Sequence, residues 1–291
     1  MKSGPFINLT TQTVSHHQIK SMDEQKVSEA NVLIIYGFGK DENMPSGSGF
    51  CQKVETFARA TKIPYELRAT LPDRAPKGKL PYITFGDETV ADSHFILKYV
   101  VQKRISRDLD ASLTPSQKAD SRAFQSYIEE HLYSCICYER WMVDANYQVV
   151  VRESFSAAPS VLRPLLGWYF WRKVRSGLWA QGVGRHSTEE VYGLLEDAVT
   201  HLAARLEVQF DITADKSRHI YFHGGESPTQ IDVILYAFLA NAIATDSNPY
   251  FNKLMLAQPA LVTFTRQMTT LLFPEYTKVL EKLDAGTLAK D

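Results

Sequence analysis

The sequence predicts an α/β domain followed by a larger domain built only of helices. Two observations predict this division. Short apolar runs rich in β-branched residues alternate with helical periodicity between residues 31 and 103, whereas helical periodicity alone recurs after residue 115. The 291 residues, 44% of them hydrophobic, are enough for one large core or two smaller ones.

The α/β domain is predicted to begin with a strand at residues 31–36. Its apolar and β-branched side chains indicate a strand buried on both faces. Residues 50–61 change to a helical period, in which Val54 and Phe57 fall on one face of an amphipathic helix. A second strand is expected at residues 65–69.

A hairpin and a helix complete this predicted domain. Residues 80–85 have a strand pattern, residues 86–87 are a turn signal, and residues 88–90 form the returning strand. Asp92 and Ser93 then provide a polar cap for a helix with periodic apolar residues. The order is β-α-β followed by β-β-α in about seventy residues, which is typical of a thioredoxin-like unit.

The helical domain is predicted to begin at Pro115. Thr114 is a suitable cap, proline is favoured at the first helical position, and periodic apolar residues continue through Val151. Further helical patterns follow at residues 189–210, 229–244 and 261–272. We therefore divide the chain into a flexible N-terminal arm, a thioredoxin-like domain, a linker and an all-helical domain. Their residues are 1–30, 31–103, 104–114 and 115–291.

The composition excludes several classes of protein. A net charge of -1 and a pI of about 6.7 provide no basic field for a phosphate backbone, so no nucleic acid is expected as a partner. Three cysteines make no disulfide framework and suit a reducing compartment. The first thirty residues lack the apolar run of a signal peptide, and no run reaches the roughly 18 apolar residues of a membrane span. The expected location is cytoplasmic.

The segment Pro45–Cys51, which ends where the first helix begins, contains two groups suited to thiol chemistry. A helix N-terminus carries unpaired amides and partial positive charge, which stabilise an anion such as a thiolate. Ser48 can donate a hydrogen bond to a bound thiolate, and Cys51 can be the thiolate itself. The alternative is that Ser48 only caps the helix and Cys51 is a small core residue.

Two further motifs suit a peptide ligand with charged ends. If the Leu80–Pro81 bond is cis, the amide and carbonyl of Leu80 turn outward and can pair with an extended peptide. Ser93 and the free amides of the next helix suit a carboxylate, and Asp92 suits an ammonium group. An ordinary trans proline and a simple N-cap are the alternatives, which the sequence leaves open.

Together, these motifs resemble the N-terminal domain of the glutathione transferase superfamily, over Asn31–Val101. Ser48–Cys51 falls where glutaredoxins and omega-like transferases carry Cys-Pro-Phe. The resemblance implies the glutathione transferase fold, with Leu80–Pro81 gripping the cysteinyl part of glutathione and Asp92–Ser93 holding its γ-glutamyl end. Thr229–Asp232 is similar to the capping box in the family's helical domain, where two side chains satisfy free amides.

The similarity extends to the metaxin and failed-axon-connections branch of this superfamily. The segments that carry it are Phe50–Glu55, Ala91–Ser93, Gln181–His186, Gly225–Thr229 and Phe273–Glu275. In all, the resemblance covers about residues 31 to 276. Members of the branch usually carry Ser-Pro-Phe-Cys, whereas this chain has Gly49 in place of the proline, and glycine loosens a helix start.

Four residues of the helical domain are candidates for a second-substrate pocket. Tyr127, His131, Cys135 and Tyr138 share one helical face because of their spacing. In the fold that the resemblance implies, this face borders the pocket for an electrophile, and interdomain core is the equal alternative. No metal site is expected, because Cys135 and Cys137 diverge on a helix and have no partner pair.

Residues 164–175 are unusually aromatic and basic. One interpretation is an interfacial helix that makes peripheral contact with a membrane or a partner. The other, which we favour, is a buried helix whose arginines reach solvent, because Gly167 and Gly177 weaken a free-standing amphipathic helix.

The resemblance implies a detoxifying, glutathione-dependent transferase with glutathione as co-substrate. Ser48 would stabilise the thiolate, which attacks a small electrophilic substrate. Members of this family usually form homodimers, so the resemblance implies a homodimer. One rival interpretation is a non-catalytic adaptor with the same fold, since the metaxin branch includes proteins with no established conjugating role. Another is a thiol-disulfide or deglutathionylating enzyme that uses Cys51.

Overall fold

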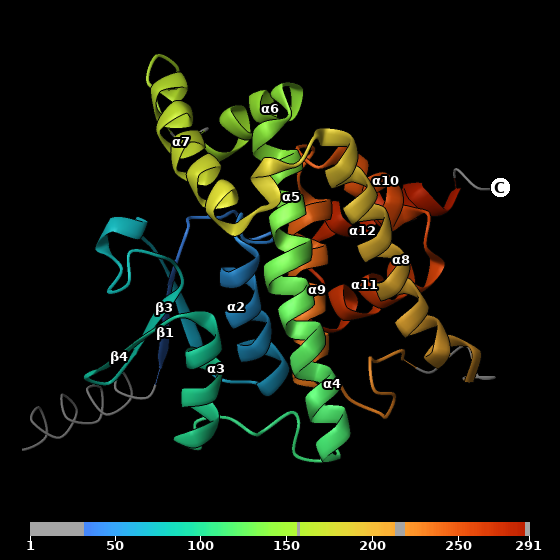
Figure 1. The fold of residues 1–291 in the computed structure, drawn as a ribbon. Coiled ribbons are helices and arrows are strands. Elements are labelled where there is room, and N and C mark those ends of the chain that lie inside the picture. Colours follow the sequence, from blue (N-terminus) through green and yellow to red (C-terminus); the bar gives the residue numbers. More distant parts are fainter. Residues whose placement is uncertain (1–31, 156–157, 213–218, 289–291) are drawn as a thin grey trace, which may run out of the picture.

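A computed structural model describes residues 32–155, 158–212 and 219–288, so the arm expected at residues 1–30 lies outside it. The chain folds into a four-stranded α/β domain beside a larger helical domain (Figure 1). The predicted fold class is therefore confirmed. Among the helices that the structure describes, none combines the length and the hydropathy that a bilayer crossing requires.

The α/β domain has the predicted order of elements. They are β1 (Leu33–Gly37), α2 (Gly49–Thr61), β2 (Tyr65–Ala69), the short 3₁₀ segment η1 (Pro72–Arg74), β3 (Tyr82–Phe85), β4 (Glu88–Ala91) and α3 (Ser93–Gln102). The strands lie in the order β2-β1-β3-β4. The β1–β2 pair is parallel and is connected through α2, whereas β1–β3 and β3–β4 are antiparallel.

Strand β1 is buried on one face only. Leu33 and Ile35 are buried, whereas Ile34 and Tyr36 are partly exposed. Helices α2 and α3 both cover the face that looks toward the helical domain, and no described helix covers the other face (Figure 1). The expectation of a strand buried on both faces is therefore wrong.

The helical domain begins with α4, which Thr114 caps and Pro115 opens, as predicted. Its elements are α4 (Pro115–Ser126), the π-helical segment η2 (Tyr127–Leu132), α5 (Tyr133–Met142), α6 (Asp144–Ser154), α7 (Arg163–Gln181), the 3₁₀ segment η3 (Val183–Arg185), α8 (Thr188–Ile212), α9 (Gln230–Ala244), α10 (Pro249–Leu256), α11 (Pro259–Leu272) and α12 (Thr277–Leu288). The helical pattern from residue 115 to 151 is thus divided among four elements.

Helix α9 is the central helix of the molecule. Its residues from Ile231 to Ile243 are all buried, as expected for a helix that is apolar around its whole circumference. It packs against α2 on one side and against α4, α11 and α12 on others. Val233 of α9 belongs to the hydrophobic core of the α/β domain, so this helix joins the two domains.

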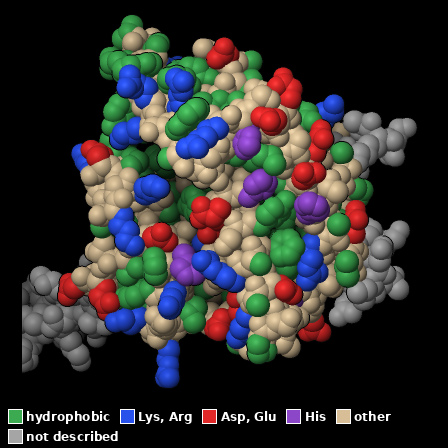
Figure 2. Space-filling view, in the orientation of Figure 1, with side chains coloured by type: hydrophobic (Ala, Val, Ile, Leu, Met, Phe, Trp, Pro, Cys, Tyr) green, Lys and Arg blue, Asp and Glu red, His purple; other side chains and the backbone are tan. Residues whose placement is uncertain are grey.

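Helix α7 differs from the favoured expectation of a buried helix. It projects from the body of the molecule (Figure 1). The side chains of Trp168 and Trp179 are about half exposed. The guanidinium of Arg172 lies over the ring of Trp168, and Lys173 lies over Tyr169. The projecting lobe therefore carries hydrophobic and basic side chains side by side (Figure 2).

Candidate functional site

The end of β1 and the start of β3 meet at one edge of the sheet, where Tyr36 pairs with Tyr82. The peptide bond between Leu80 and Pro81, directly before β3, is cis. The backbone N–H of Asp92 donates a hydrogen bond to the carbonyl of Pro81 at 3.3 Å. The proline bend and the start of α3 are therefore adjacent.

Helix α3 starts with a residue in an unusual backbone conformation. Asp92 has φ 86° and ψ 125°, a region that residues with a Cβ rarely adopt and that is enriched at ligand sites. Its Oδ1 accepts a hydrogen bond from the N–H of His94 at 2.9 Å, so Asp92 is the N-cap. Ser93 follows as the first helical residue and is buried.

A buried lysine joins α2 to this helix start. The ammonium group of Lys53 donates to Oγ of Ser93 at 3.2 Å and to Oε1 of Glu129 at 2.5 Å. Gln125 also donates to Glu129. Burial lowers the pKa of Lys53, and the nearby Glu129 carboxylate opposes that shift. A charge this deeply buried requires such a partner.

This arrangement suits a ligand that carries a carboxylate and an ammonium group close together. Ser93 accepts a hydrogen bond from Lys53, which leaves its own proton for a ligand carboxylate. The charge of Lys53 and the free amides of α3 favour the same anion. Asp92 and Glu129 supply negative charge for an ammonium group.

Comparisons with known proteins identify the family to which this chain belongs. A family model described as the glutathione S-transferase N-terminal domain matches residues 49–146. The isoprene-epoxide–glutathione S-transferase of Rhodococcus sp. (strain AD45) is 33% identical over 196 residues, which cover 65% of this chain and 82% of that protein. The chain belongs to the glutathione S-transferase superfamily.

Within the glutathione S-transferase superfamily, the chain is in the metaxin-like branch. It is 28% identical to Failed axon connections of Drosophila melanogaster over 272 residues, which cover 88% of this chain and 62% of that protein. It is also 28% identical to metaxin-1 of Sus scrofa over 197 residues, 64% of this chain and 58% of metaxin-1. The matched part is thus less than two thirds of the length of these two relatives.

Solved glutathione transferases have the same fold. The crystal structure of glutathione transferase GSTFuA2 from Phanerochaete chrysosporium superposes with a TM-score of 0.57 at 16% identity, covering 83% of this chain and 98% of that chain. At this low identity the likeness concerns the fold alone.

In this transferase-family chain, Ser48 is the N-cap of α2. Its Oγ accepts a hydrogen bond from the N–H of Cys51 at 3.4 Å, and the side chain is partly exposed. Because capping uses a lone pair of the hydroxyl, the proton stays available to a thiolate. Gly49 follows, and a Cβ there would lie 2.8 Å from the ring of Phe238. This contact gives a steric reason for glycine at the position where relatives carry proline.

Cys51 lies in the core rather than at the surface. Its side chain is buried, and a Cβ on Gly37 would lie 3.3 Å from the Cys51 sulfur. Burial raises the pKa of the Cys51 thiol to about 11, although Ser48 opposes the shift. A reactive cysteine requires the opposite shift and an accessible sulfur. The core interpretation of Cys51 is therefore favoured.

The four residues predicted for the electrophile pocket lie within the helical domain. The rings of Tyr127 and His131 stack at 5.2 Å, and the Tyr127 hydroxyl is 3.2 Å from Nδ1 of His201 on α8. Cys135 and Tyr138 belong to the hydrophobic core of that domain. Cys135 and Tyr138 therefore pack inside the helical domain rather than in the interdomain core that the alternative named, and Tyr127 and His131 are partly exposed. In the residues that the structure describes, no cluster of His, Cys, Asp or Glu has the arrangement of a metal site.

Sequence reasoning missed Lys53 and Glu129. Lys53 lies four residues before Phe57, on the helical face predicted to be buried. Because lysine is rarely buried without a partner, this position could have marked Lys53 as a candidate. Glu129 comes from the helical domain, and nothing local in the sequence places it beside Ser93.

Proposed function

We propose that the protein binds glutathione at this edge of the sheet and adds its thiolate to a small electrophile. The observation that carries the proposal is the buried group of Lys53, Ser93 and Glu129, next to Asp92 and the cis Pro81. Superfamily membership supports it, and so does the Rhodococcus relative, whose name states a reaction of glutathione with an epoxide. The corresponding physiological proposal is a cytoplasmic, detoxifying homodimer.

Each part of glutathione has a proposed partner. The γ-glutamyl carboxylate binds Ser93 and Lys53, and its ammonium group binds Asp92 and Glu129. The backbone of Leu80 pairs with the cysteinyl residue. The thiolate then accepts a hydrogen bond from Ser48 at the N-terminus of α2, which lowers the thiol pKa. Holding the thiolate beside the electrophile supplies the remaining acceleration.

Calorimetric titration with glutathione tests binding directly. Ser93→Ala removes the hydroxyl, and Asp92→Asn removes the charge while keeping an oxygen for the cap and a residue type that tolerates positive φ. We expect each variant to bind about tenfold more weakly. Asp87→Asn, the same change at an exposed turn, should bind like the wild type. Wild-type protein that takes up no glutathione would contradict the proposal.

The role of Ser48 has its own test. Ser48→Ala should raise the thiol pKa of bound glutathione and lower kcat for a model electrophile, with glutathione affinity unchanged. A Ser48→Ala enzyme that conjugates at the wild-type rate removes this role.

A non-catalytic adaptor is the second candidate, and the exposed face of α7 favours it. Trp168, Tyr169 and Trp179 are about half exposed, in a helix that carries several cations. If the protein is an adaptor, titration with glutathione should give no heat of binding. A partner protein should bind, and its association should require Trp168 and Trp171. The same titration therefore separates the two functions.

A further inference from the structure

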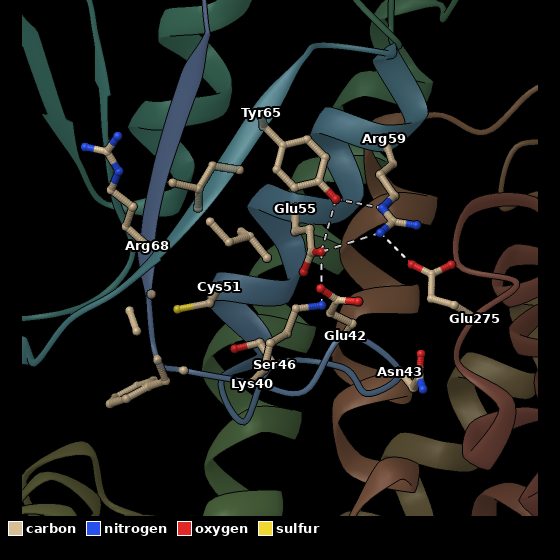
Figure 3. A pocket seen from close by; sticks show the side chains of 16 residues that line it. Lys40, Glu42, Asn43, Ser46, Cys51, Glu55, Arg59, Tyr65, Arg68 and Glu275 are labelled. Carbon is tan, nitrogen blue, oxygen red and sulfur yellow. Dashed lines mark hydrogen bonds and ion pairs between the residues drawn. The ribbon is translucent and has the colours of Figure 1, made fainter.

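A separate cavity lies on another face of α2. It has a volume of about 560 Å³, is partly open to solvent, and is bordered by the loop after β1, by α2 and β2, and by Glu275 from the helical domain (Figure 3). Cys51, Glu55 and Arg59 line it from successive turns of α2. None of the residues proposed to bind glutathione lines this cavity, and Lys53 is directed toward Ser93 instead.

Glu55 has one carboxylate oxygen that the protein leaves unsatisfied. Its side chain is almost completely buried, and Oε1 receives the ammonium of Lys40 at 3.0 Å and the hydroxyl of Tyr65 at 3.1 Å. Oε2 is buried and has no hydrogen-bond partner among the described residues. Leaving a buried acceptor without a donor costs free energy, so native proteins seldom do so without a reason.

The neighbouring donors are already occupied. Lys40 also donates to the hydroxyl of Tyr276 at 2.6 Å. Arg59 donates to the Tyr65 hydroxyl at 2.7 Å and pairs with Glu275 at 2.5 Å. Neither cation can turn to Oε2 of Glu55 without giving up these bonds, so the described residues supply no donor for this oxygen.

The remaining lining indicates what kind of molecule carries that donor. Ile35, Phe38 and Leu67 provide apolar walls. Glu42, exposed on the loop, is a second carboxylate and has no ion pair among the described residues. The cations of the lining already have ion-pair partners: Lys40 pairs with Glu55, Arg59 with Glu275 and Arg68 with Glu66. A cationic donor would therefore gain from Glu42 and from Oε2 of Glu55, whereas an anionic ligand would meet the charge of Glu42 and would offer Oε2 no proton.

We propose that this cavity binds a small organic amine, whose ammonium group donates to Oε2 of Glu55 while its apolar body packs against Ile35, Phe38 and Leu67. This amine site does not involve glutathione, so the proposal stands whether or not the protein is a transferase.

Three probes with a similar apolar body test which charge the ligand must carry. Titration of the full chain with 2-phenylethylamine, 2-phenylethanol and 3-phenylpropionate compares a cation, a neutral donor and an anion on the same apolar body. We expect saturable binding of the amine, at least about tenfold tighter than either other probe, because a charge-assisted hydrogen bond is the stronger kind. Saturating glutathione should leave the amine affinity unchanged. Equal binding of the three probes, no binding of the amine, or its displacement by glutathione would overturn the proposal.

Two variants locate the site by different means. Glu55→Gln removes the charge, and Leu67→Trp fills the cavity from β2 without touching the ion pairs. Each should weaken amine binding at least about tenfold. Leu71→Trp, a similar change at an exposed residue outside the cavity, should bind like the wild type. Because Leu67 is itself 42% exposed, its replacement should fold normally, and unaltered amine affinity in Leu67→Trp would exclude this cavity.

Discussion

At the scale of single residues, the start of α2 depends on the absence of one methyl group. A Cβ at position 49 would meet the ring of Phe238, which is fully buried and packs edge-on against Phe50. We expect Gly49→Ala to lower the free energy of unfolding by about 1–3 kcal/mol, as overpacking in a core does. Gly47→Ala is the matched control, because its Cβ would have no atom within 4 Å. Equal urea midpoints for both variants would contradict this steric explanation.

Also at this scale, the sequence predicted the residues whose side chains bond to the backbone of near neighbours in the chain. Ser48 and Asp92 are recognisable as caps because a cap depends on its next few neighbours. Lys53, Glu55 and Glu129 escaped prediction because their partners come from distant segments: Lys53 reaches Glu129, and Glu55 reaches Lys40 and Tyr65. Apart from Asp92, the charged side chains proposed here to bind ligands are therefore recognisable only in the tertiary structure.

At the scale of elements, the start of α9 carries a titrating group. The carboxylate of Asp232 accepts hydrogen bonds from the backbone N–H groups of Thr229 and Phe222, at 2.8 and 2.6 Å, and completes the predicted capping box. Burial nevertheless raises the pKa of Asp232 to about 6. Between pH 4 and 6 the folded state thus holds a proton that the unfolded state has lost, so this residue's contribution to stability falls as pH rises.

We therefore expect the stability of the wild type relative to Asp232→Asn to decrease by a few kcal/mol from pH 4 to pH 6, since one pKa unit corresponds to about 1.36 kcal/mol. The comparison cancels the groups that titrate in both proteins. Urea unfolding of the two proteins across this pH range measures it. A difference that stays constant would show that the pKa of Asp232 is the same in the folded and unfolded states, and a difference that grows with pH would show that folding lowers it; either result would contradict this prediction.

Helices α4 to α7 show that the sequence predicts where a helix forms more readily than which of its faces is buried. The apolar period predicted helix from residue 115 to 151, and it is helical, but the π-helical segment Tyr127–Leu132 changes which residues share a face. Helix α7 has aromatic residues that resemble a buried stripe, yet Trp168 and Trp179 are exposed. The amino-acid pattern shows that a helix can bury a face, not that a neighbour covers it.

At the scale of the whole molecule, α2 is shared by the two domains. Ten of its 13 residues are buried, because it packs on the sheet on one side and on α9 on the other. Each proposed site lies against α2 and includes one carboxylate from the helical domain, Glu129 in one and Glu275 in the other. Both sites therefore exist only while the domains are docked.

This shared helix predicts that the two domains unfold together. All four tryptophans lie between residues 141 and 179, so tryptophan fluorescence reports on the helical domain alone. Amide hydrogen exchange in β1 reports on the sheet. We expect both probes to give the same urea midpoint, and we expect Val233→Ala, which trims the α9 side chain in the sheet's core, to lower both midpoints equally. If β1 exchanged at a lower urea concentration than the fluorescence change, the α/β domain would be opening independently. The carboxylates of Glu129 and Glu275 would then be separated from α2 before the helical domain unfolds, and ligand at either site should protect β1 first.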